Sequence, residues 1–214
     1  MTDNRMSGLA LILGSAGTII TMALHPTGHN LFAPGQLEPM ARMTFFVHVL
    51  ALVCMPALFL GAWGLSRQLM SPRRFSIVAL VMYGFGTVAA MIAAAVSAFI
   101  FPNVARQIAT GTPAASDAAR IMFNYTVEIV QAFARVLVLM SSAAIVLWSI
   151  SVVKSKQFGT GLGIYGCILG PVTVVAVFSG HLSLDVHGFG MVMLTQAIWC
   201  VVAGVTLWRM KEQH

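Results

Sequence analysis

Long apolar runs, separated by short polar or basic segments, dominate the chain from end to end. A run of about 20 apolar residues is long enough to cross the roughly 30 Å hydrocarbon core of a bilayer as a helix. The pattern predicts six such helices, at residues 9–25, 43–65, 75–101, 122–153, 158–181 and 188–208. The segments between them are too short for a separate soluble domain, so residues 1–214 are predicted to form one all-α transmembrane bundle.

The polar segments between these runs differ in character. The segment between the first two helices contains Pro26, Gly28, Pro34 and Gly35, which favours a loop. Residues 103–120 are polar enough to form an exposed connection, with Ser116 and Asp117 placed to cap the long helix that follows.

Composition excludes a water-soluble fold and changes the meaning of the net charge. Hydrophobic residues make up 58% of the chain and charged residues only 8%, with a mean hydropathy of +0.88. The net charge of +6 does not indicate nucleic-acid binding, because the basic residues flank the apolar runs. We therefore expect membrane lipid, and no nucleic acid, among the partners.

The basic residues also predict an orientation. One side of the predicted bundle carries Arg5, Arg67, Arg73, Arg74, Lys154, Lys156, Arg209 and Lys211, and the other carries Arg42, Arg106 and Arg120. Basic residues concentrate in cytoplasmic loops, so both termini are predicted to be cytoplasmic. With its compact loops, the chain is interpreted as a multi-pass protein of the bacterial cytoplasmic (inner) membrane.

Glycines in the fifth predicted helix are spaced for close helix packing. Gly159 and Gly163 lie four residues apart, as do Gly166 and Gly170. Each pair leaves a flat strip that another helix can approach closely. The approaching helix can belong to the same chain or to another copy, so a homo-oligomer stays open. The same stretch matches GxGxxG, but without the strand that a dinucleotide-binding fingerprint requires.

Histidines gather at one level of the predicted bundle. Counting 1.5 Å per residue from the cytoplasmic basic residues places His25, His29, His48, His181 and His187 at or just beneath the outer face. The corresponding inner level has no histidine. Ionisable side chains at membrane depth usually face the bundle interior or a wet cavity. This gathering is the main functional signal in the sequence.

Further polar residues are predicted to join the histidines. Asn124, Glu128, Gln131 and Arg135 recur every three or four residues, so they share one face of the fourth helix, which we expect to point inward. His48 has no strongly polar neighbour on its own helix, and a hydrogen bond to Glu128 or Gln131 would satisfy it. Asp185 lies in a short turn between His181 and His187.

Each of these residues also has a purely structural interpretation. His25 and His29 suit the headgroup region as ordinary loop residues. The turn from His181 to His187 is typical of a solvated hairpin. Glu128 and Arg135 are equally consistent with an ion pair that fixes helix packing.

The first functional hypothesis is a metal or haem site. Its ligands would be drawn from His48, His181, His187, His25 and Glu128, with Gln131, Arg135, Asp185, His29 and Asn124 as the other polar groups of the pocket. Zinc would hold an activated water with Glu128 or Asp185 as base, copper would use the imidazoles, and haem b would use one or two axial histidines. An electron wire across the bilayer is disfavoured, because the inner level lacks histidine.

Two further hypotheses involve no metal. The first is binding or transport of a small molecule or lipid, taken from the outer leaflet or the periplasm, in a cavity that ends inside the membrane. Such a closed cavity suits ligand binding or an enzyme better than a pump. The second is an accessory membrane subunit whose polar cluster is structural. The sequence identifies no catalytic residue and leaves open whether the protein is an enzyme.

Overall fold

The computed structural model describes residues 3–26, 35–69, 74–155 and 158–210, and apart from short turns the chain is helical in these ranges. The elements are α1 (Asp3–Ala23), α2 (Leu37–Gln68), α3 (Phe75–Ala95), the π-helical turn η1 (Val96–Ile100), α4 (Phe101–Thr110), α5 (Pro113–Ser155), α6 (Thr160–Phe178) and α7 (Val186–Arg209). Within the described residues, six helical segments are long and apolar enough to cross a membrane, with α3, η1 and α4 counted as one. The six-helix prediction is confirmed, and the helices fit an integral membrane protein.

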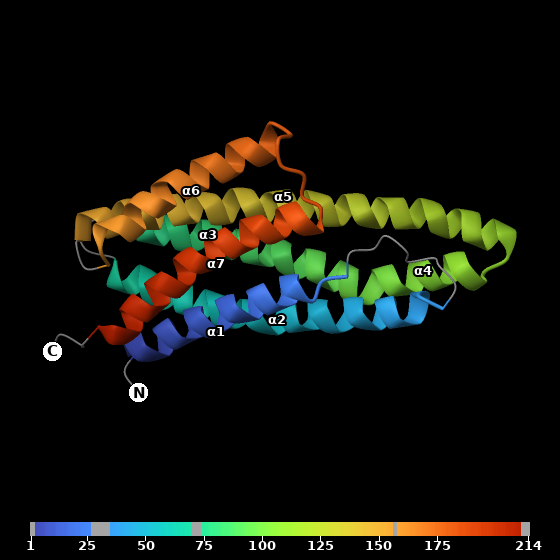
Figure 1. The fold of residues 1–214 in the computed structure, drawn as a ribbon, viewed down its shortest axis with the longest axis horizontal. Helices are drawn as coiled ribbons and strands as arrows, with labels where there is room; N and C mark the ends of the chain where they lie inside the picture. Colours follow the sequence, from blue (N-terminus) through green and yellow to red (C-terminus); the bar gives the residue numbers. More distant parts are fainter. Residues whose placement is uncertain (1–2, 27–34, 70–73, 156–157, 211–214) are drawn as a thin grey trace.

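Helix α1 begins and helix α7 ends at the same end of the bundle, which we call the terminal end; the opposite end is the distal end (Figure 1). The start of α1 with Arg5, the end of α2 with Arg67, and the start of α3 after Arg74 all lie at the terminal end. Lys154 in the last turn of α5 and Arg209 in the last turn of α7 join them. Basic residues therefore collect at one end of the bundle, as the sequence predicts.

Three helical segments are much longer than a bilayer requires: α2 with 32 residues, the continuous segment α3–η1–α4 with 36, and α5 with 43. At 1.5 Å per residue, α1 is about 31 Å long, close to the roughly 30 Å hydrocarbon core, whereas α5, with 43 residues, is about 64 Å long. Figure 1 shows α4 and the adjoining parts of α2 and α5 projecting at the distal end beyond α1, α6 and α7. We call this projecting part the distal extension.

The distal extension corrects the predicted connection at residues 103–120. Helix α4 continues to Thr110, and α5 begins at Pro113. Proline is well suited to the start of a helix, because the backbone N–H that it lacks has no intrahelical partner there. Ser116 and Asp117 lie inside α5 rather than at its cap, and the Ser116 hydroxyl donates to the carbonyl of Ile108 at 2.9 Å and so joins α4 to α5.

The distal extension also contains an ion pair, and a π-helical turn precedes it. The guanidinium of Arg106 on α4 donates to both carboxylate oxygens of Glu38 on α2, at 2.7 and 3.1 Å. Both side chains are exposed, so the pair links α2 to α4 but adds little stability. The π-helical turn η1 lies just before Pro102, which cannot donate a backbone hydrogen bond into the preceding turn.

An aromatic core fills the terminal half of the bundle. The indole rings of Trp148 on α5 and Trp199 on α7 stack at 6.0 Å, and Tyr83 on α3 lies 5.3 Å from Trp148, centroid to centroid. Trp148 Nε1 donates to Ser66 Oγ at 2.9 Å, and Trp199 Nε1 donates to the carbonyl of Leu162 at 3.2 Å. These bonds satisfy both buried indoles, and we call Tyr83, Trp148 and Trp199 with their buried neighbours the aromatic core.

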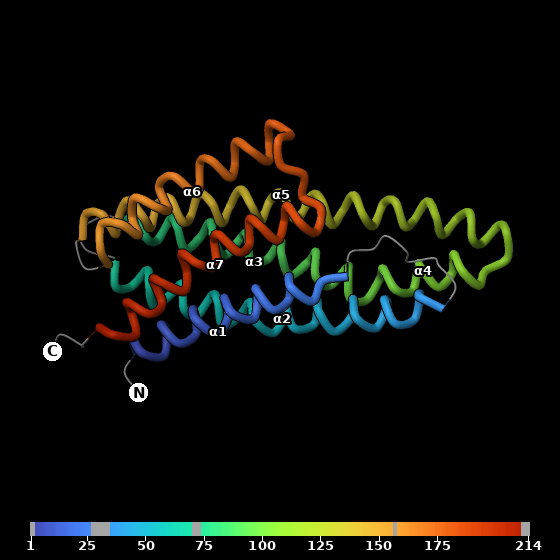
Figure 2. Tube along the Cα trace, in the orientation of Figure 1, coloured from blue at the N-terminus to red at the C-terminus, as the bar shows by residue number. Residues whose placement is uncertain are grey.

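The glycine strip of α6 packs against α5 within the same chain. A Cβ atom at Gly163 would lie 3.0 Å from the carbonyl oxygen of Ser149, and one at Gly170 would lie 2.8 Å from that of Ser142. Figure 2 shows the traces of α5 and α6 side by side from the terminal end. The predicted close approach is therefore made inside the bundle at Gly163, Gly166 and Gly170, whereas a Cβ atom at Gly159, which precedes α6, would meet no atom within 4 Å.

Candidate cavity site

A cavity of about 900 Å³ lies inside the bundle. Its described lining comes from α1, α2, α3, η1, the start of α4, α5, α7 and the turn before α7, and none of it from α6. The cavity lies at the upper end of the roughly 300–1,000 Å³ that is usual for small-molecule sites.

The cavity is long and ends at the aromatic core. Its lining on α2 runs from Met40 to Leu58, which is about 27 Å at 1.5 Å per residue. At the terminal end the lining includes Tyr83, Ile145 and Cys200, all of them buried members of the aromatic core. At the distal end it includes the exposed Asp185. The described lining thus runs from the aromatic core, towards the terminal end, to the exposed Asp185, towards the distal end.

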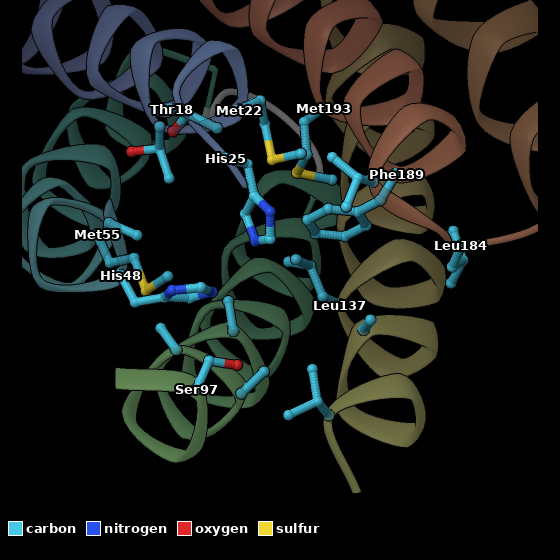
Figure 3. Close-up of a pocket in the computed structure, with 18 of the residues that line it drawn as sticks. Thr18, Met22, His25, His48, Met55, Ser97, Leu137, Leu184, Phe189 and Met193 are labelled. Atoms are coloured by element: carbon cyan, nitrogen blue, oxygen red, sulfur yellow. The ribbon is translucent and has the colours of Figure 1, made fainter. Parts of the chain in front are cut away.

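Two of the predicted histidines meet inside this cavity. His25 follows the end of α1, His48 lies on α2, and both are partly buried. Their ring centroids are 5.0 Å apart with an interplanar angle of 77°. Figure 3 shows both imidazoles projecting into the cavity among apolar side chains. We call these two residues the histidine pair.

Hydrogen bonds to the backbone define the form of both imidazoles. His48 Nδ1 lies 2.7 Å from the carbonyl oxygen of Thr44, and His25 Nδ1 lies 3.1 Å from that of Pro26. A carbonyl oxygen only accepts, so each Nδ1 carries the proton and each Nε2 keeps its lone pair when the ring is neutral. The partner of His48 is thus a carbonyl of its own helix and not Glu128 or Gln131, as the sequence suggested.

Gln131 and Asp185 line the cavity but have local structural partners. Gln131 Nε2 donates to the carbonyl of Leu184 at 3.1 Å and so attaches the turn before α7 to α5. Asp185 caps α7, accepting from the backbone N–H groups of His187 and Gly188 at 3.0 and 2.9 Å and from the Ser183 hydroxyl at 2.7 Å. The N–H of Gly188 and the Ser183 hydroxyl are the main causes that lower the pKa of Asp185.

The other predicted site residues that the structure describes do not line the cavity. His181 and His187 are exposed on the turn before α7 and in its first turn, and His181 Nδ1 lies 2.7 Å from Ser179 Oγ. Among the residues that the structure describes, no three His, Cys, Asp or Glu side chains form a group that could hold a metal ion. The ligand set of His25, His48, His181, His187 and Glu128 is therefore not assembled. His29 lies outside the described residues.

The polar stripe on α5 is not oriented as the sequence predicts. Asn124, Glu128 and Arg135 are exposed, and only Gln131 faces the cavity. The inward orientation was expected from membrane depth, but Glu128 lies about 39 Å along α5 from Lys154, farther than the roughly 30 Å hydrocarbon core. Part of the stripe thus reaches past the bilayer thickness, where a charged side chain has no reason to turn inward.

Much of the cavity wall consists of residues that were not predicted from the sequence. Ala90, Ala93 and Ala94 leave space on α3, and the flexible thioethers of Met55 and Met193 line other walls. The sequence feature that could have predicted this space is the alanine-rich run at residues 89–95, because small side chains on one helix face leave volume in a bundle.

Comparison of the chain with protein-family models, with curated proteins and with solved structures finds no match. The function is therefore inferred from the cavity itself.

Proposed function

We propose that this protein binds a small amphipathic molecule, taken from the surrounding membrane or from the adjoining aqueous phase, in the cavity of its bundle. The observation that carries the proposal is the shape and lining of the cavity, about 900 Å³ in volume and about 27 Å long. A chain-like molecule fills a long apolar space, and the histidine pair offers a polar contact inside it. Methionines on the wall adapt to different shapes of ligand.

The orientation belongs to the same proposal. With the basic residues of the terminal end in the cytoplasm, the cavity opens towards the periplasm or the outer leaflet of a bacterial inner membrane. Its ligand would then come from that side. A homo-oligomer is compatible with this arrangement, because the cavity is formed within one chain.

Transport is the less favoured form of this proposal. A transporter needs access from both sides, and the aromatic core lies between the cavity and the terminal end. A cavity that ends inside the bundle is more consistent with a carrier of bound lipid, a sensor or an enzyme.

A metal or haem is the second candidate, favoured by the two imidazole nitrogens of the histidine pair. Zinc and copper both accept imidazole, and a neutral Nε2 is the usual ligand atom. Haem b would use one histidine, but its propionates lack a cationic partner in the described lining. Iron, copper and zinc content per chain, measured on untagged protein, decides between this candidate and a metal-free ligand.

The proposal is tested by filling the cavity. Ala134 lines it and is buried, whereas Ala132 is exposed on the same helix and does not line it. In Ala134→Phe we expect native mass spectrometry and solvent extraction to show loss of the co-purifying small molecule, and in Ala132→Phe its retention. Equal retention by both variants, or wild-type protein that neither co-purifies nor takes up any amphipathic molecule, would contradict the proposal.

A further inference from the structure

We infer that the histidine pair recognises a neutral head group that donates a hydrogen bond, so that the ligand is a hydroxyl-headed amphiphile such as a long-chain alcohol or a monoacylglycerol. This inference rests on the proposed function and specifies the class of ligand. It is carried by the hydrogen bonds of the two imidazoles, by the charges of the cavity wall, and by the place of the pair along the cavity.

The hydrogen bonds leave two acceptors in the cavity. Both Nδ1 atoms are engaged with the carbonyls of Thr44 and Pro26, so the atom that each neutral ring presents to a ligand is the lone pair of Nε2. A charged imidazole is costly inside a membrane-spanning helix, which favours the neutral form of His48. For His25, which lies beyond α1, burial lowers the pKa below 6.5 and has the same effect. Two neutral acceptors select a ligand that donates.

The charges of the wall exclude other head groups. The described lining contains no lysine or arginine, so an anionic head such as a carboxylate or a phosphate would have no cation to pair with. The one carboxylate in that lining, Asp185, already accepts three hydrogen bonds as the cap of α7, so it is poorly placed to pair with a cationic head. A neutral donor is the head group that this wall accommodates best.

The position of the pair leaves room for a chain. From His48 the lining of α2 continues through Ala51 and Met55 to Leu58, about 15 Å further towards the aromatic core. Leu137 and Met193 face the same space from α5 and α7 (Figure 3). A hydroxyl at the histidine pair can therefore extend its hydrocarbon chain towards the aromatic core.

The test compares three ligands of equal chain length: a long-chain primary alcohol, its methyl ether and the corresponding carboxylic acid. Binding of each radiolabelled ligand is measured on the full chain in lipid nanodiscs. The alcohol is expected to bind about tenfold more tightly than the ether, the worth of one hydrogen bond in a buried site. The acid is expected to bind more weakly than the alcohol at neutral pH.

Variants of the pair locate the recognition. His48→Leu and His25→Leu are each expected to abolish the preference for alcohol over ether. In His48→Gln the amide oxygen can replace Nε2 as acceptor, so part of the preference should return. The matched control is His187→Leu, an exposed histidine outside the cavity, which should keep the full preference.

The outcomes separate this inference from the proposed function. Equal binding of alcohol and ether by the wild type, blocked in Ala134→Phe, would overturn the donor inference and leave the proposed function standing. No binding of any of the three ligands, together with no co-purifying molecule, would overturn both. Stoichiometric zinc or copper that is lost in His48→Leu would also overturn the inference, because the Nε2 lone pairs would then belong to the metal.

Discussion

Backbone carbonyls, rather than charged side chains, determine which nitrogen of His25 and of His48 carries the proton. Each ring is fixed through Nδ1 by a carbonyl one or four residues away, and the two rings lie edge to face. A lone histidine in an apolar run could be identified as polar and buried from the sequence. Its local acceptor could not, because which carbonyl is free to accept depends on the rotamer of the ring.

Ligand binding should depend on pH through this pair. The pKa of His25 lies below 6.5, so the ring is neutral at pH 7 and above, where binding is expected to be constant. As the pH falls through this lowered pKa, Nε2 gains a proton and changes from acceptor to donor, so affinity for the alcohol should fall. Asp185 stays ionised over this range, because its pKa lies below 3.8. Binding isotherms between pH 5 and 8 check this; affinity that rises in acid would contradict it.

Ser66 has a similarly local role in the aromatic core. Its hydroxyl accepts from the buried Trp148 Nε1. Ser66→Ala leaves this donor unpaired and should lower the free energy of unfolding by about 1 kcal/mol, within the range found for polar contacts between membrane helices. Denaturation by sodium dodecyl sulfate in mixed micelles measures it. Ser151→Ala is the control, since Ser151 donates only to Leu147 of its own helix, and an equal loss there would argue against the assigned role.

At the scale of elements, the apolar runs were predictable but the ends of the helices were not. Hydropathy marks where a helix can lie in lipid, and it located all six. It does not mark where a helix stops once it enters water, so the predicted helix at residues 122–153 is the inner part of α5, which begins at Pro113. The inward orientation expected for Glu128 was wrong for the same reason.

The packing of α6 on α5 depends on glycine where the two backbones meet. Gly170→Leu should separate the helices, because any Cβ there meets the Ser142 carbonyl, and should lower the thermal unfolding temperature in detergent. A Cβ atom at Gly161 would meet no neighbouring atom within 4 Å, so Gly161→Ala should be neutral or slightly stabilising. Equal unfolding temperatures for the two variants would refute this account of the contact.

At the scale of the whole molecule, the gathering of histidines at one level was only partly informative. Depth along each helix was readable from the sequence, and it located His25 and His48 at similar heights. Rotation about each helix axis, and the exposed turn that carries His181 and His187, depend on packing between helices. The sequence predicted a cavity only because polar residues at membrane depth need one. The small residues that leave space for it, such as Ala90, Ala93 and Ala94, were not part of that prediction.

The proposed orientation makes a prediction for the intact cell. Thr112 is exposed in the turn between α4 and α5 at the distal end, and Thr160 is exposed at the start of α6 at the terminal end. A membrane-impermeant maleimide should label Thr112→Cys in cells with a permeabilised outer membrane, and Thr160→Cys only after the inner membrane is opened. The unsubstituted chain, with its three native cysteines, gives the background. The reverse pattern would invert the topology.

The aromatic core at the terminal end of the cavity limits what the protein can do with the ligand that we propose. In the proposed function the ligand enters and leaves at the distal end, so it leaves on the side from which it came and no gradient is built. Occupancy then follows the local concentration on one face of the membrane alone. In the proposed function the fold sets the residence time of the ligand, through how long its head group stays with the histidine pair.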